Sequence, residues 1–217
     1  LAALGDRAVP DLARALDDRA RPLALRLQLP RVLRDIGTPD AANTLLKSNQ
    51  RDDAALQHRI GEALWAMRRK DVRMPLDLLW VREAIGRRLD RFEELEPQLA
   101  AVRAKLPEAH LLVRAVRRRT EQALEVAFRL LAMLGSPGPV MDAYHRLQTG
   151  TSHERSYAAE LVEHLAPDRR LGRRLAAAAE RHPRAPGSHR PDPTQFEPVL
   201  KQLCANEDRV LSGCACQ

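Results

Sequence analysis

Leucine, valine and alanine recur along most of this chain at spacings of three and four residues. Gly and Pro fall mostly between these periodic segments, and long stretches lack the alternation that marks a half-buried strand. Aromatic residues make up only 3% of the sequence, so small and medium aliphatic side chains carry the core. This pattern predicts an all-α fold built from closely packed helices.

The first part of the chain, residues 1–74, contains a helical pattern that occurs twice. A short amphipathic helix leads to Leu16, and a second helix begins at Pro22 and stops at Gly37. The same order follows, with a short helix from Thr38 and a longer one after residues 52–53. Arg26 and Arg59 stand at equivalent points, thirty-three residues apart. Two adjacent copies at this period predict stacked helix pairs.

The run Leu4 to Leu12, which reads Leu-Gly-Asp-Arg-Ala-Val-Pro-Asp-Leu, is followed by two Asp and then by Arg26. This order resembles the HEAT repeat and implies a HEAT-type α-solenoid. In that family an acidic residue and an arginine form a ladder of hydrogen bonds between repeats. The resemblance implies that Asp17 or Asp18 pairs with Arg26, and Asp52 or Asp53 with Arg59. It also places Arg155 at the corresponding position of a later repeat.

Residues 75–135 break this rhythm with two long apolar series, one from Leu78 to Leu106 and one from Val113 to Leu134. They predict an antiparallel coiled hairpin of two long helices that interrupts the solenoid, with Pro97 inside the first helix. Further HEAT-like helices are expected over 136–182, a proline-rich loop over 183–193, and the start of a truncated pair over 194–217. We expect Cys214 and Cys216 to lie in a poorly packed tail.

This combination of repeats and a long hairpin resembles the soluble HEAT region that follows the membrane domain in bacterial ATP/ADP-translocase-like major-facilitator proteins. The sequence begins at Leu1 inside a repeat motif. The resemblance implies a cytoplasmic fragment of a larger protein, held at the cytoplasmic face of the membrane if that parent is a membrane protein. The expected partners are other proteins or neighbouring domains of the parent chain.

The net charge of +7 comes from 36 basic and 29 acidic residues, and only four of the basic residues are lysine. An excess of arginine and alanine is typical of a GC-rich genome, so the charge has a compositional explanation. The positive charge is also compatible with an anionic membrane or a nucleic acid as the partner. The candidate anion or partner patches are two arginine clusters: Arg117, Arg118 and Arg119, and Arg169, Arg170, Arg173 and Arg174.

The seven histidines are scattered and form no His-Glu-x-x-His zinc motif. The three cysteines lie near the end of the sequence and suit buried thiols better than a metal site. We therefore expect no catalytic, cofactor-binding or metal-binding residues. The sequence favours a non-enzymatic interaction or regulatory scaffold. The alternative is a nucleic-acid-binding solenoid of the DNA-glycosylase type, which the scarcity of aromatic residues disfavours.

Overall fold

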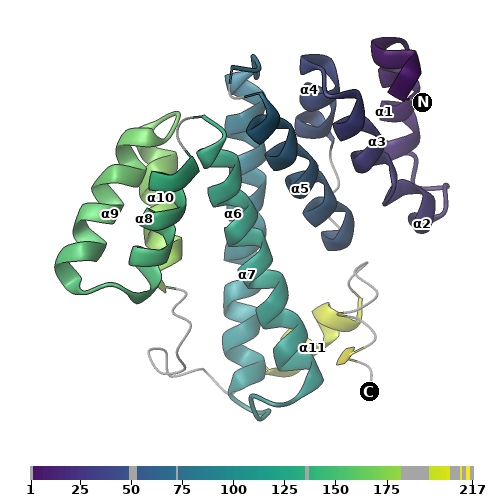
Figure 1. Cartoon of the computed structure of the whole chain (residues 1–217). Coiled ribbons are helices and arrows are strands. Elements are labelled where there is room, and N and C mark those ends of the chain that lie inside the picture. The colour runs from purple at the N-terminus through teal and green to yellow at the C-terminus, as the bar shows by residue number, and fades with distance from the viewer. Residues whose placement is uncertain are drawn as a thin grey trace.

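The computed structural model describes residues 2–48, 53–71, 73–134, 137–181, 196–205, 211, 214 and 215. Over these residues the chain is all-helical and contains no strand, so the predicted fold class is confirmed at that level (Figure 1). In chain order the elements are η1 (Ala2–Ala8), α1 (Val9–Asp17), α2 (Leu23–Arg26), α3 (Leu29–Ile36), α4 (Pro39–Lys47), α5 (Ala54–Lys70), α6 (Leu78–Arg103), α7 (Leu111–Ala132), α8 (Pro137–Thr149), α9 (Ser152–Leu165), α10 (Arg169–Arg181) and α11 (Phe196–Cys204).

Short polar side chains set where several helices begin. The side chains of Thr38 and Asp53 accept hydrogen bonds from backbone N–H groups in the first turns of α4 and α5. Thr151 and Glu154 form a reciprocal capping box at the start of α9, and the hydrogen bond from the Thr151 backbone lowers the pKa of Glu154. Gly37 ends α3 in the left-handed conformation, with φ of 73°.

The single helix expected from Pro22 to Gly37 is two helices in the structure. α2 ends at Arg26 and α3 begins at Leu29, with Pro30 in its first turn. Pro30 has no backbone N–H to donate to the carbonyl of Arg26, and its ring conflicts with that carbonyl in a continuous helix. By contrast, α6 runs through Pro97, as the unbroken apolar spacing predicts.

The helices contact one another in two rows. In the first row α1 packs against α4, and α4 packs against α6. In the second row α3 packs against α5, and α5 packs against α7. The long helices α6 and α7 lie side by side in the centre of the molecule and make its most extensive helix contact, with α8 and α10 on their other side (Figure 1).

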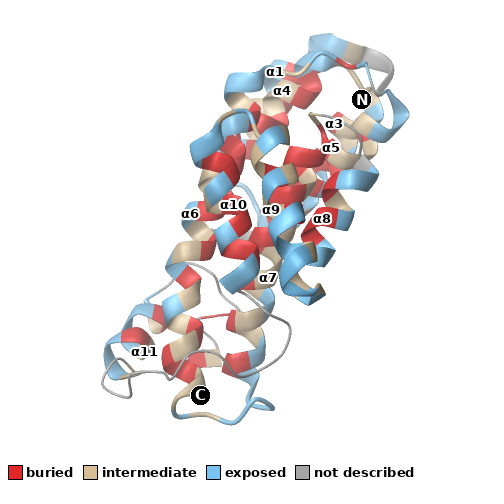
Figure 2. Cartoon of the chain, turned by 90° about the vertical axis from the view of Figure 1, so that its left-hand side faces the viewer, coloured by how far each residue is buried: buried red, intermediate tan, exposed pale blue. Residues whose placement is uncertain are grey.

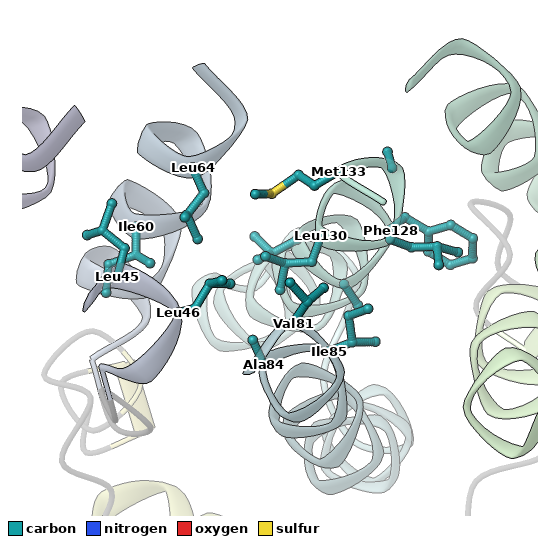
Figure 3. Close-up of a cluster of buried hydrophobic side chains, with 14 of the residues drawn as sticks. Leu45, Leu46, Ile60, Leu64, Val81, Ala84, Ile85, Phe128, Leu130 and Met133 are labelled. Carbon is teal, nitrogen blue, oxygen red and sulfur yellow. The ribbon is translucent and has the colours of Figure 1, made fainter. Parts of the chain in front are cut away.

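The main core extends from α1 through the rows to α10. Figure 3 shows side chains of α4 and α5, among them Leu46 and Leu64, directed toward Val81 and Leu130 of the central helices. On the other side of α7, Phe128 stacks at 4.5 Å between ring centroids on Tyr144 of α8. The central helices are therefore packed on two sides.

A second apolar cluster occupies the far ends of α6 and α7, where α11 packs (Figure 2). Leu211 and Ala215 are buried in this cluster, and Cys214 is half-buried against it. The ends of α6 and α7 therefore supply apolar surface to the described residues around Cys214, while the expectation of a poorly packed tail stays a prediction. Cys216 lies outside the described residues.

Replacing Phe128 by alanine should test the role of the central helices. Because the ring is fully buried between α7 and α8, we expect Phe128→Ala to lower the free energy of unfolding by about 3–5 kcal/mol. Urea denaturation followed by circular dichroism measures this loss. Tyr157→Ala is the control, since its side chain is 63% exposed and the change should stay within about 0.5 kcal/mol. Equal losses in both variants would contradict the assignment.

Candidate functional site

The structure shows the surroundings of residues expected in the HEAT ladder. Arg26 is buried, and its Nε donates to the backbone oxygen of Leu16 at 3.0 Å. That oxygen belongs to the last turn of α1, where carbonyls lack a partner within the helix. Arg26 therefore ties α2 to the end of α1. Asp18 accepts from Arg21 Nε at 3.2 Å and from the Ala20 N–H at 3.0 Å, which shapes the turn between the two helices.

In the second of the expected repeats, Asp53 caps α5 by accepting the Leu56 N–H at 3.0 Å. Arg59 is exposed and pairs with Glu62 of its own helix at 3.2 Å. Arg155 is exposed on α9, and its side chain has no partner among the described residues. The thirty-three-residue spacing therefore relates Arg26 and Arg59 in sequence without giving them the same surroundings.

Sequence reasoning missed Arg87, which holds a helix end in the way that Arg26 does. Its Nη2 donates to the backbone oxygen of Leu46, in the last turn of α4, at 2.6 Å. The two residues lie 41 positions apart, and α6 contains several other arginines. Only the packing of α4 against α6 distinguishes Arg87 from them.

The arginine cluster on α7 is largely occupied within the molecule. Arg117 pairs with Glu108 at 3.2 Å, and Arg103 contacts the same carboxylate at 2.8 Å. Arg119 donates to Gln122 at 3.2 Å. Arg118 is the exposed member of the three. This cluster therefore presents one largely solvated guanidinium rather than a block of three.

The cluster on α10 is divided in the same way. Arg174 donates to Glu93 and to Asp90 of α6, at 2.8 Å in each case. The hydrogen bond with Glu93, and then that with Asp90, raises the pKa of Arg174 above its ordinary value. Arg173 contacts Glu163 of α9 at 3.2 Å, whereas Arg169 and Arg170 are exposed.

Ion pairs join α10 to α6 along much of its length. Arg82 of α6 contacts Asp168, whose other carboxylate oxygen caps α10 through the Leu171 N–H. Near the other end of α10, Arg181 contacts Glu96 at 3.3 Å. The paired residues lie about 80 positions apart in the sequence, so no local sequence pattern predicts these pairs.

Between these helices lies an open hollow of about 380 Å³. Gly86 of α6 forms part of its lining, and a Cβ placed there would meet no atom within 4 Å. The lining contains four arginines and three carboxylates: Arg82, Arg87, Arg170, Arg174, Glu83, Asp90 and Asp168. Arg82, Arg87 and Arg174 each contact a carboxylate or a backbone oxygen. Arg170 has no partner among the described residues.

No group of His, Cys, Asp and Glu suited to a metal ion occurs in the described part of the chain. In the same residues, no helix combines the length and apolar character needed to cross a membrane. Comparison with protein-family models, curated proteins and solved structures finds no match to this chain. The candidate site therefore rests on the geometry of the α6–α10 hollow alone.

A double-mutant cycle should measure how strongly the α6–α10 contact holds. Arg174 and Glu93 are 32% and 39% exposed, so solvent reduces their coupling to about 1 kcal/mol. We expect this value from chemical denaturation of Arg174→Gln, Glu93→Gln and the double variant. The matched Arg173–Glu163 cycle should give less than about 0.5 kcal/mol, because Arg173 is 67% exposed. Equal coupling energies would show that the Arg174–Glu93 pair stabilises the fold no more than the exposed Arg173–Glu163 pair does.

Proposed function

We propose that this chain is a non-enzymatic interaction scaffold built as a HEAT-type solenoid. The two rows α1–α4–α6 and α3–α5–α7 support this proposal, because each helix packs mainly on its neighbours in the row and on its pair partner. That arrangement is typical of repeat proteins, in which successive units bury one continuous core. In this proposal α6 and α7 are a long antiparallel hairpin inserted into the stack.

The resemblance to the soluble region of translocase-like proteins gives the proposal its cellular setting. The scaffold would be a cytoplasmic piece of a larger protein and would link a neighbouring domain to a protein partner. The extensive apolar packing of α4 and α5 against α6 and α7 suits such a link, because it makes the helix rows mechanically continuous.

The α6–α10 hollow is the surface that we assign to the partner. Its four arginines exceed its three carboxylates by one, and Arg170 is the arginine that has no partner among the described residues. A protein segment that carries a carboxylate would satisfy Arg170 with a charge-assisted hydrogen bond. The absence of a side chain at Gly86 leaves room for it. The proposed partner is therefore an acidic protein segment.

The nucleic-acid alternative has less support. Arg117, Arg173 and Arg174 are already bound to carboxylates, and those acids lie among the basic residues. Among the described residues, Tyr157 is the only aromatic side chain that is largely exposed. A surface that binds single strands uses several aromatic side chains for stacking. The arginines of this chain serve mainly to join helices.

Site-specific photo-crosslinking in cells of the source organism would test this function. A photoreactive residue at position 170 should capture a protein, whereas the same residue at exposed Arg155 on α9 should not. Gly86→Gln should remove the product at position 170 by filling the hollow. That variant should fold well, because glutamine is the better helix former by about 0.5–1 kcal/mol.

Equal products at both positions, or a product unaffected by Gly86→Gln, would contradict the assignment of the hollow.

Duplex DNA binding at low salt, measured by fluorescence anisotropy, distinguishes the scaffold proposal from the nucleic-acid alternative. Phosphate contacts strengthen steeply as salt falls, so a nucleic-acid solenoid would bind under these conditions. The scaffold proposal predicts no saturable binding, and tight binding that depends on Arg169 and Arg170 would overturn it.

A further inference from the structure

Arg88 of α6 is buried, and no described residue supplies a counter-charge for it. Its exposed fraction is 8%, and its Nε is a fully buried atom with no hydrogen-bond partner. Arg88 makes no hydrogen bond or ion pair with any described residue. A guanidinium carries five N–H donors and is costly to remove from water when they stay unpaired. The folded chain therefore holds a buried positive charge whose partner is not a side chain among the described residues.

Arg88 lines a small cavity between three helices. The polar side chains around it are Gln57 and His58 from α5, Arg88 and Arg91 from α6, and Arg119 and Gln122 from α7. Every one of them can donate a hydrogen bond, and the lining contains no carboxylate. A cavity walled by donors and positive charges favours an anion.

The carboxylates that pair with Arg91 and His58 are exposed to solvent. Arg91 pairs at 3.1 Å with Glu94, which is 61% exposed. His58 Nε2 lies 3.3 Å from Glu62, which is 44% exposed, while His58 Nδ1 is buried and has no hydrogen-bond partner. The pairs with carboxylates therefore form toward the solvent, and unpaired ring and guanidinium nitrogens remain on the inner side.

The helix crossing explains why a cavity exists here. α5 and α7 approach closely at Gly61, where an added Cβ would lie 3.2 Å from Val126 Cγ1. One turn earlier, α5 carries the longer side chains of Gln57 and His58. The cavity also lies where the two apolar clusters meet, since Leu95 belongs to one and Ala123 to the other. Its volume is about 20 Å³, enough for one water or an ion of similar size.

Burial, and to a lesser extent the charge of neighbouring Arg87, lowers the pKa of Arg88 to about 9. The group still carries its proton at neutral pH. The need for a negative partner therefore persists under ordinary conditions. Water could fill the space, but it would not neutralise the charge.

We propose that the cavity between α5, α6 and α7 binds one small inorganic anion of halide size, held by the guanidinium of Arg88. The anion accepts hydrogen bonds from Arg88 and from the donors of α5 and α7 around it. It thereby joins α5 to both of the central helices, α6 and α7. This site is independent of the α6–α10 hollow, and its test does not depend on a protein partner.

Bromide provides the direct probe, because it replaces chloride and scatters anomalously. Crystals of the whole chain grown with sodium bromide should show an anomalous peak within hydrogen-bond distance of the Arg88 guanidinium. The absence of a peak there, with peaks only at the surface, would overturn the proposal. This measurement uses the unmodified protein and does not require any variant to fold.

Thermal unfolding provides the second readout. Chloride is titrated against gluconate at constant ionic strength, and Tm should rise and then follow the logarithm of chloride concentration. At a concentration of about 100 times the dissociation constant, the ratio of folded to unfolded protein should increase roughly a hundredfold. Arg88→Met should abolish this dependence and should be more stable than the unmodified chain in gluconate, because it removes the unpaired charge.

Arg114→Met is the matched control, since Arg114 is an exposed arginine of α7 outside the cavity lining. It should keep the chloride dependence of the unmodified chain. The same chloride dependence in Arg88→Met would show that chloride binds at another site, and it would overturn the proposal.

Inorganic phosphate forms the last arm of the titration. Stabilisation by phosphate but not chloride, lost in Arg88→Met, would overturn the halide-sized assignment in favour of an oxyanion.

Discussion

The packing of α6 against α7 is the contact on which the other parts of the molecule depend. Leu89 and Phe92 on α6 and Leu124 and Ala127 on α7 are wholly or almost wholly removed from water. These helices also bury residues against α4 and α5 on one side and against α8 and α10 on the other. Without this central pair, the two groups of shorter helices would have no common surface to bury, and each is too small to hold a large core alone.

Arginine supplies most of the polar contacts between helices. Arg26 and Arg87 each donate to a carbonyl at the end of a helix, where the backbone lacks an internal partner. Arg174 bridges two carboxylates of α6 from α10. Guanidinium groups suit these positions because their planar donors reach backbone oxygens and carboxylates at fixed angles. Much of the basic charge is therefore used inside the molecule, which weakens the link between a net charge of +7 and a nucleic-acid partner.

The α6–α10 hollow and the Arg88 cavity differ in how their charges are balanced. The hollow is open and contains carboxylates, so most of its arginines are paired and water screens the remainder. The cavity is small and has no carboxylate, so its charge stays uncompensated in a medium of low dielectric constant. The first arrangement suits a partner that comes and goes at the surface. The second suits an ion that becomes part of the folded structure.

The sequence by itself determined the helical class and most of the helices, although not the division between α2 and α3. The apolar spacing of the helices and terminal residues such as Thr38, Asp53 and Gly37 act within a few positions, and these local effects are readable in one chain. It also places Arg88 on the buried stripe of α6, three residues after Ile85 and four before Phe92. Only the tertiary structure decided that α5 and α7 bring no carboxylate to Arg88, and that Asp90 and Glu93 meet Arg174. Charge pairing depends on distances of a few ångströms between helices that lie far apart in sequence, and no local pattern encodes those distances.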